Sequence, residues 1–180
     1  MKFRANWIKS IVLVAALATT STSIAQEAKK PAAKKPTASW LVNCSPTPDG
    51  ASMLCLMSQT FNQVNTQTKS QQRLMTISIR PQPTDKTKRP LLSLALPHGL
   101  HFPSGANFKV DDQPAVPITL QTSDPNGVYT ATPLGPKTIA AMKKGNAITI
   151  TMFTRNQKPL SIPVSLVGFT AAFNKINSSQ

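Results

Sequence analysis

Hydrophobic and polar residues alternate with a period of two along much of the chain, which is the pattern of β-strands with one buried face. Turn sequences rich in proline, glycine and asparagine separate these runs. The alternating runs cover residues 40–44, 54–58, 75–80, 91–96, 115–120, 148–153 and 160–166, with shorter candidates at 107–111 and 128–132. The pattern predicts a mainly β protein, in which about eight or nine short strands form an antiparallel sandwich.

Two of the predicted strands contain a proline, at Pro117 and at Pro163. Proline has no N–H to donate to a neighbouring strand, so these two strands are expected at sheet edges or at bulges. The whole chain holds 16 prolines in 180 residues. Because a proline inside a helix costs about 3 kcal/mol, this content argues against a helical bundle.

Two segments have the spacing of short helices. In residues 136–144, a proline opens the first turn and Gly145 follows the last one. In residues 167–176, Phe169 and Phe173 recur at helical spacing and form an apolar stripe. We expect the apolar faces of both helices to pack on the core of the sandwich.

The first 25 residues have the three parts of a secretory signal peptide. A basic start is followed by the apolar run of residues 11–18 and by small residues up to Ala25, so we predict cleavage between Ala25 and Gln26. This apolar run is about half of the roughly 20 residues that span a bilayer, which disfavours an N-terminal membrane anchor. After cleavage we expect no transmembrane segment, and a location in the periplasm, the outer membrane or the cell surface.

Residues 26–38 form a linker of lysine, proline and alanine, and the remaining residues 39–180 have the length of one domain. The linker has no large apolar side chain to bury, so it is expected to be a disordered, extended tether. Its basic residues are Lys29, Lys30, Lys34 and Lys35. We predict that these lysines help to bind an anionic surface, since each basic residue near such a surface contributes about 1 kcal/mol.

Basic residues outnumber acidic residues by 20 to 6 in the whole chain, giving a net charge of +14. From residue 38 onward, 13 basic and 5 acidic residues leave +8, so the predicted domain is basic as well. The charge either serves solubility alone or attracts the protein to lipopolysaccharide, anionic phospholipid or acidic glycans. Specific nucleic-acid binding is disfavoured, because only 6% of residues are aromatic and no nucleic-acid-binding motif is present.

Cys44 and Cys55 are the two cysteines of the chain. Export would place them in an oxidising compartment, where such a pair is normally bridged. A turn sequence with proline, aspartate and glycine separates them, so we expect a hairpin clasped by a disulfide that is worth about 3 kcal/mol. The spacing matches neither a CxxC pair nor a lone activated thiol, which argues against redox catalysis.

Candidate residues for catalysis or metal binding are few. His98 and His101 lie in a loop rich in proline and glycine, and two histidines without a third ligand are weak support for a metal site. We expect both to face solvent. The sequence has no GxSxG elbow and no HExxH motif, and four of its Asp residues lie in turn-like settings. We therefore expect no catalytic residues, no metal site, no cofactor and no enzymatic activity.

Three segments are distinctive when taken together. They are Trp40-x-Val42-x-Cys44 followed by Cys55, the sequence LALPHGL of residues 94–100, and the sequence PVSLVGFTAAF of residues 163–173. With these segments the chain resembles the invasion-associated locus B family of Gram-negative bacteria, over roughly residues 38–176.

The resemblance implies an exported, non-enzymatic protein with an immunoglobulin-like antiparallel β-sandwich. Some members of the family are linked to the entry of bacteria into host cells, erythrocytes included. Members often carry a second cysteine pair in a segment that corresponds to residues 121–128, where this chain keeps Gly127 but has no cysteine. The C-terminal half is therefore expected to rely on its hydrophobic core alone.

Taken with the charge, the resemblance predicts an exported protein that contributes to host-cell invasion or virulence through a basic surface that binds acidic envelope or host-surface ligands. The alternative is a periplasmic binding or envelope-maintenance module for an anionic ligand, with no direct role in the host. Peripheral membrane association is compatible with both. An inhibitor of host lysozyme would have to attract a basic enzyme, and a net charge of +8 opposes this.

Overall fold

The computed structural model describes residues 40–47, 50, 53–82 and 89–178. Within these residues the chain forms ten β-strands, two α-helices and one short 3-10 helix. The predicted signal peptide, its cleavage site between Ala25 and Gln26, and the tether with its four lysines lie outside the described residues. These three assignments therefore stay predictions.

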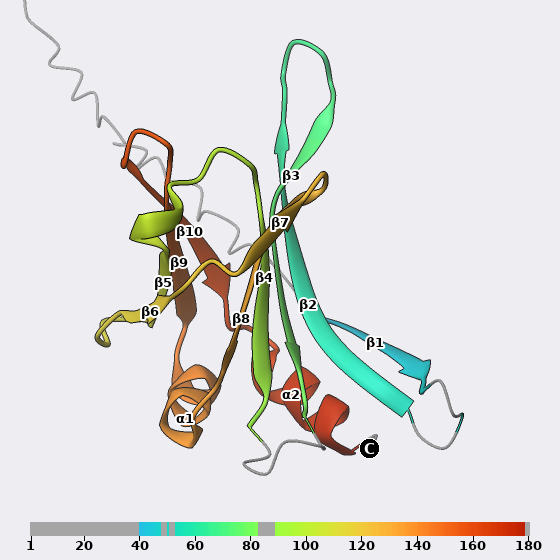
Figure 1. The fold of residues 1–180 in the computed structure, drawn as a ribbon. Coiled ribbons are helices and arrows are strands. Elements are labelled where there is room, and N and C mark those ends of the chain that lie inside the picture. Colours follow the sequence, from blue (N-terminus) through green and yellow to red (C-terminus); the bar gives the residue numbers. More distant parts are fainter. Residues whose placement is uncertain (1–39, 48–49, 51–52, 83–88, 179–180) are drawn as a thin grey trace, which may run out of the picture. The chain divides into compact units, whose positions relative to one another are not determined.

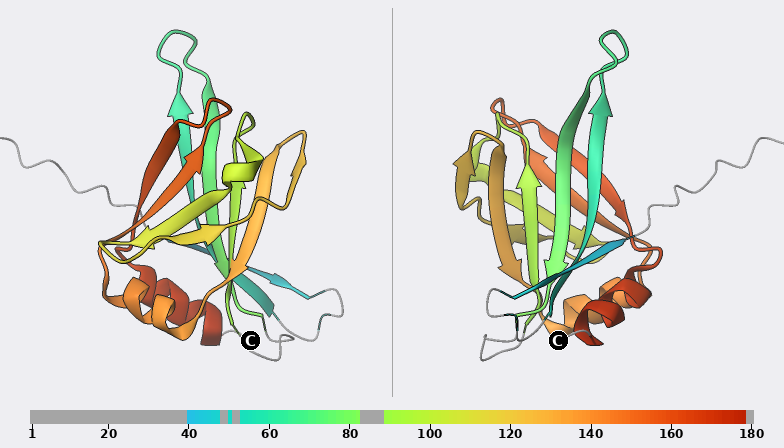
Figure 2. Two further views of the ribbon diagram at one scale, coloured as in Figure 1. Left: turned by 60° about the vertical axis from the view of Figure 1, so that its left-hand side comes forward. Right: turned by 90° about the vertical axis from the view of Figure 1, so that its right-hand side faces the viewer.

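The strands form two antiparallel sheets that face each other (Figures 1 and 2). The six-stranded sheet has the order β1-β2-β3-β4-β8-β7, with β1 at Leu41–Pro46, β2 at Met53–Val64, β3 at Gln71–Arg80, β4 at Leu91–Leu96, β7 at Thr122–Asp124 and β8 at Gly127–Pro133. The four-stranded sheet has the order β10-β9-β5-β6, with β5 at Ala106–Val110, β6 at Val116–Ile118, β9 at Ala147–Phe153 and β10 at Pro159–Ser165. The 3-10 helix spans Phe102–Ser104. The predicted mainly β sandwich is confirmed.

Alternating burial explains why these runs form strands. In β9, Ile148, Ile150 and Met152 are fully buried, and the residues between them are half-buried. The facing sheet presents buried side chains of the same kind, at Met75, Ile77, Ile79, Leu92, Leu94 and Leu96. Burial of each such side chain stabilises the fold by about 1.5–3 kcal/mol. These two inner faces form the core of the sandwich.

The strands that contain proline lie at the two edges of the four-stranded sheet. β6 contains Pro117 and β10 contains Pro163, and each strand pairs on one side only. An edge strand has one side without ladder hydrogen bonds, so the missing proline N–H costs nothing there. The expectation drawn from these two prolines is confirmed.

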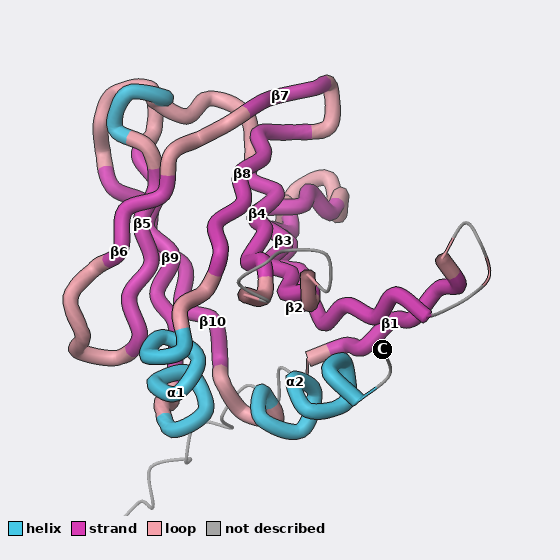
Figure 3. The backbone as a smooth tube through the Cα atoms, turned by 60° about the horizontal axis from the view of Figure 1, so that its bottom comes forward, coloured by secondary structure: helices cyan, strands magenta, loops and turns pink. Residues whose placement is uncertain are grey.

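Two helices lie side by side at one end of the sandwich (Figure 3). α1 spans Pro136–Lys144, as predicted. α2 spans Phe169–Ser178 and starts two residues later than predicted, because Gly168 has a φ of +78°, which a right-handed helix cannot contain. The buried stripe of α2 includes Phe169 and Phe173, whose rings stack at 5.6 Å between centroids, and Trp40 meets the ring of Phe169 edge-on at 5.5 Å.

The sequence pattern missed the length of the β2–β3 hairpin and all of β7. Among the described residues, β2 and β3 pair only with each other between Met75 and their turn, and this turn stands away from the rest of the sheet (Figure 2). We call residues 61–75 the ribbon. Most of its side chains are polar and exposed on both faces, so no period-two hydrophobic signal marks it. β7 has three exposed residues and gives no signal for the same reason.

Candidate functional site

The described basic residues of the domain gather mostly at the end where the helices lie. Arg80 pairs with Leu91 and Leu91 with Pro133, so the end of β3, the start of β4 and the start of α1 meet there. We call this region the helix end and define it as α1, α2 and the strand ends and loops beside them. Its described basic residues are Arg80, Arg89, Lys109, Lys137, Lys143, Lys144 and Lys175, and its described acidic residues are Asp111 and Asp112.

The carboxylate of Asp111 has a structural role, because it binds backbone N–H groups of a neighbouring segment. The carboxylate accepts hydrogen bonds from the backbone N–H of Asn146 at 3.0 Å and of Ala147 at 2.9 Å. Gly145 makes this contact possible, because a Cβ at that position would lie 2.8 Å from Asp111 Oδ2. Asp111 thus joins the end of β5 to the start of β9, and its charge is shared with two donors at the helix end.

Lys137 and Lys144 border a shallow hollow of about 330 Å³ beside α1. They are seven residues apart on the helix and therefore lie on one face of it. Gln113, Ala140 and Ala141 also line the hollow, together with Asp111, whose carboxylate is hydrogen-bonded to the backbone. Neither ammonium group has an acidic partner among the described residues.

Lys143 and Lys144 also have a structural role that involves no ligand. Both lie in the last turn of α1, where positive charge interacts favourably with the helix dipole by about 0.3–1 kcal/mol. Lys143 Nζ lies 5.0 Å from the centre of the Phe173 ring and 3.5 Å from Asn174 Oδ1. These contacts help to hold α1 against α2 and leave the charge at the surface.

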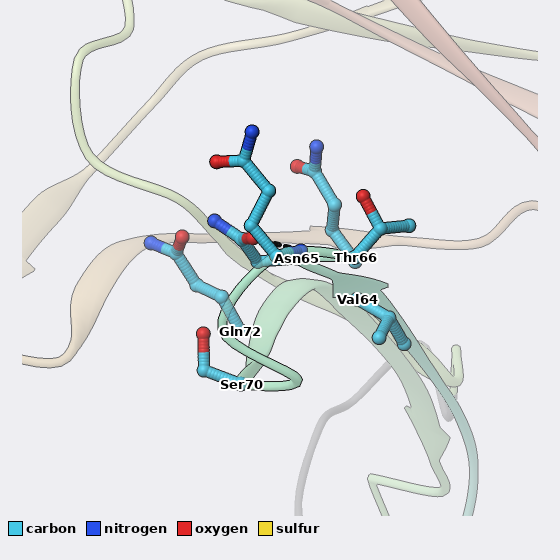
Figure 4. A pocket seen from close by; sticks show the side chains of 7 residues that line it. Val64, Asn65, Thr66, Ser70 and Gln72 are labelled. Atoms are coloured by element: carbon cyan, nitrogen blue, oxygen red, sulfur yellow. Dashed lines mark hydrogen bonds between the residues drawn. The ribbon is translucent and has the colours of Figure 1, made fainter.

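The opposite end of the sandwich has a different chemical character. We call it the hairpin end and define it as the ribbon, the β7–β8 turn and the β9–β10 turn. Its described basic residues are Lys69, Arg73, Arg155 and Lys158, and its described acidic residue is Asp124. A hollow of about 380 Å³ at the ribbon tip is lined by Gln63, Val64, Asn65, Thr66, Gln67, Ser70 and Gln72 (Figure 4). Its amide and hydroxyl groups carry no charge.

The β7–β8 turn, where the family often has a second disulfide, is held by polar contacts instead. Arg73 donates from Nη2 to the carbonyl of Asn126. Asp124 accepts a 2.7 Å hydrogen bond from the N–H of Asn126, which is the main cause of the lowered pKa of this exposed carboxyl group. The expectation that this half relies on its core alone is therefore incomplete. The sequence pattern did not reveal this contact, because Arg73 lies 53 residues from Asn126 in the chain.

The two histidines serve separate loops. His98 is exposed, as expected, and its Nε2 lies 3.2 Å from the carbonyl of Pro125. His101 is half-buried, which differs from the expectation that it faces solvent, and its Nδ1 lies 2.8 Å from Ser104 Oγ in the 3-10 turn. In the described part of the chain, no three His, Cys, Asp or Glu residues come close enough to hold a metal ion. In the same part, no helix is long and apolar enough to cross a membrane.

The predicted disulfide between Cys44 and Cys55 is confirmed. The two residues lie directly opposite each other in the β1–β2 pair, with their Cα atoms 4.0 Å apart. Cys55 is fully buried and Cys44 is exposed. The bridge therefore ties an exposed edge strand to the core. The other predicted site residues, Lys29, Lys30, Lys34 and Lys35, lie outside the described residues.

Comparison with known proteins identifies relatives over most of the described region. The family model "Invasion associated locus B (IalB) protein" matches residues 40–177. Two proteins named as invasion protein B homologs, from Brucella abortus strains 2308 and 9-941, are each 31% identical over 140 residues, which covers 77% of this chain and 76% of theirs. The crystal structure of invasion associated protein b from Bartonella henselae has a similar fold, with a TM-score of 0.63 at 21% identity, covering 77% of this chain and 90% of that one.

Proposed function

Because this chain belongs to the invasion associated locus B family, we propose that it is an exported invasion-associated protein that works by binding an anionic surface rather than by catalysis. The observation that carries the binding proposal is the helix end. Seven described basic residues gather there against two described Asp residues, and Asp111 is already hydrogen-bonded to the backbone. The ligand would be an acidic component of the envelope or of the host-cell surface.

Export to the periplasm or the outer surface fits the one disulfide of the domain. A structural disulfide persists in an oxidising compartment and is rare in the cytosol. The bridge between Cys44 and Cys55 is therefore compatible with the predicted signal peptide and its cleavage before Gln26. The protein would reach its ligand from outside the inner membrane, as a peripheral rather than a spanning protein.

Binding would be the sum of many weak contacts. Each basic side chain near an anionic membrane contributes about 1 kcal/mol, and the attraction decays over a Debye length of about 10 Å at 0.1 M salt. The tether lysines would add to the helix end, because a second attachment on the same chain acts at a high effective concentration. Attachment would therefore be reversible and sensitive to salt.

Vesicles containing anionic phospholipid or lipopolysaccharide test this proposal with two matched variants of the mature protein. The first variant carries Lys137→Gln, Lys143→Gln and Lys144→Gln at the helix end. The second carries Lys69→Gln, Arg155→Gln and Lys158→Gln at the hairpin end, with the same loss of charge. We expect the first variant to bind up to about 100-fold more weakly and the second to change by less than about threefold. Equal losses in both variants, or binding that persists at high salt, would contradict the proposal.

The role in invasion needs a cellular test that separates it from envelope maintenance. A deletion strain is complemented with the native gene or with the helix-end variant, and host-cell entry is measured beside envelope integrity. We expect the variant to restore envelope integrity but not entry. Loss of integrity without any loss of entry would favour the alternative of a periplasmic module with no direct role in the host.

A further inference from the structure

The four outer strands of the two sheets differ in how they are protected against pairing with another chain. β6 and β10 each contain a proline within the strand, and β7 has three residues. Proline and short length are two common ways in which an edge strand avoids extending its sheet. β1 has six residues, no charge, and no proline before its last residue, Pro46. It is the outer strand without such protection in the described part of the chain.

The disulfide shows which backbone groups of β1 point away from β2. Directly opposed residues in an antiparallel pair have Cα atoms about 5.5 Å apart when they are hydrogen-bonded and about 4.5 Å apart when they are not. The 4.0 Å separation of Cys44 and Cys55 places them in the second class. The classes alternate along a strand, so Asn43 and Ser45 bond to β2. The N–H and C=O groups of Val42 and Cys44 then face the open edge.

The same alternation can be checked on the other side of β2. It makes Thr60 and Thr76 a pair without backbone hydrogen bonds, in which side chains lie closest to each other. Their hydroxyl oxygens are 3.1 Å apart, as this class requires. The assignment of outward-facing groups on β1 therefore agrees with an independent contact.

We propose that β1 pairs with β1 of a second copy of this chain, antiparallel and about a twofold axis at Asn43. In this register Val42 of each copy lies opposite Cys44 of the other. Each such pair exchanges two backbone hydrogen bonds, so every outward N–H of these residues gains an acceptor. Asn43 of one copy lies opposite Asn43 of the other. The two six-stranded sheets become one continuous sheet across the axis.

The charge of the β1 edge and its contact area both affect whether a second copy of the chain can bind there. β1 and β2 contain no charged residue, so the two edges meet without a charge on either strand, although each domain is basic overall. Leu41, Met53 and Leu54 are 60%, 44% and 36% exposed beside this edge, and a neighbouring copy would cover part of them. A strand of six residues is about 20 Å long, which gives less contact than the roughly 1,200 Å² of a stable interface. The pair is therefore weak and forms where the local protein concentration is high.

Cysteine crosslinking of the mature protein tests both the partner and the register. Asn43→Cys places two thiols in a directly opposed pair of the same class as Cys44 and Cys55. We expect a disulfide-linked dimer under mild oxidation, seen on a non-reducing gel, with peptide mapping locating the bridge at position 43 of both chains. Leu41→Cys and Ser45→Cys should each stay monomeric alone but crosslink when the two proteins are mixed. Asn62→Cys, an exposed position in the ribbon, is the control and should stay monomeric.

Sedimentation velocity and a second variant test whether the protein also forms dimers without a crosslink. Sedimentation velocity of the native mature protein should show dimer that increases with concentration. Asn43→Lys should be monomeric throughout, because two like charges would meet at the axis, and its melting temperature should stay near that of the native protein. A native protein that remains monomeric at every concentration, together with no crosslink from Asn43→Cys, would overturn the proposal. Crosslinking through Leu41→Cys or Ser45→Cys alone would also overturn it, because the register would then be wrong.

Discussion

The helix end and the ribbon lie at opposite ends of the sandwich and are stabilised in different ways. At the helix end, α2 buries Phe169, Phe173 and Ile176 against the sandwich. Nearby, the Trp40 indole N–H and the Gln59 side-chain amide both donate to the carbonyl of Ser165, at 3.1 and 2.9 Å. In the part of the chain that the structure describes, no third strand pairs with the ribbon.

The two regions also differ in the side chains that they expose to solvent. Four of the helix-end lysines, Lys137, Lys143, Lys144 and Lys175, lie on helices whose other faces are buried, so the spacing of these lysines is set by a rigid framework. The ribbon presents mainly uncharged amide and hydroxyl groups on a two-stranded hairpin, a structure that is marginally stable alone. The proposed anion-binding surface would gain from the first arrangement, because less conformational entropy would be lost on binding.

The largest expected effect is at the helix end. Phe169→Ala removes a fully buried ring that contacts both Trp40 and Phe173. Deleting a buried aromatic ring costs about 3–5 kcal/mol, from lost burial and from the cavity that remains. Chemical denaturation should show this loss as a lower unfolding midpoint with an unchanged slope. A loss below about 1 kcal/mol would mean that α2 contributes little to the fold.

The disulfide should have the next largest effect. Cys44→Ser is expected to lower the free energy of unfolding by about 2–4 kcal/mol, because the unfolded chain is no longer constrained by a closed loop. The native protein, unfolded without reductant, should contain no free thiol, since Cys44 and Cys55 are bridged. Two reactive thiols in that titration, or unchanged stability of the variant, would contradict the structure at this edge.

The smallest effect is expected in the ribbon. Val64→Ser changes a side chain that is 52% exposed and lies at the tip. Surface substitutions of this kind change stability by less than about 0.5 kcal/mol. Thermal melts of Val64→Ser and Phe169→Ala under the same conditions compare the two losses of stability directly. A loss of stability comparable to that of Phe169→Ala would show that the ribbon tip is packed against other residues. The proposed difference in packing between the two regions would then be contradicted.

Local signals in the sequence were enough for the elements that bury one face. Strands such as β9 follow from the alternation of Ile148, Ile150 and Met152 with the residues between them, such as Thr149 and Thr151. α1 follows from its opening proline and from Gly145 after its last turn. Pro117 and Pro163 indicated edge strands, because the missing N–H acts on the strand that contains it. In each case the cause lies within a few residues of its effect.

What only the tertiary structure decided is which distant residues meet. The ribbon and β7 bury almost nothing, so their length depends on pairing with a neighbouring strand rather than on a hydrophobic pattern. The sequence shows the excess of positive charge, but the gathering of Arg80, Lys109 and Lys143 at one end follows from strand register and helix packing. The open edge of β1 is likewise a property of the sheet order. Such contacts join residues far apart in the chain, and no local pattern records them.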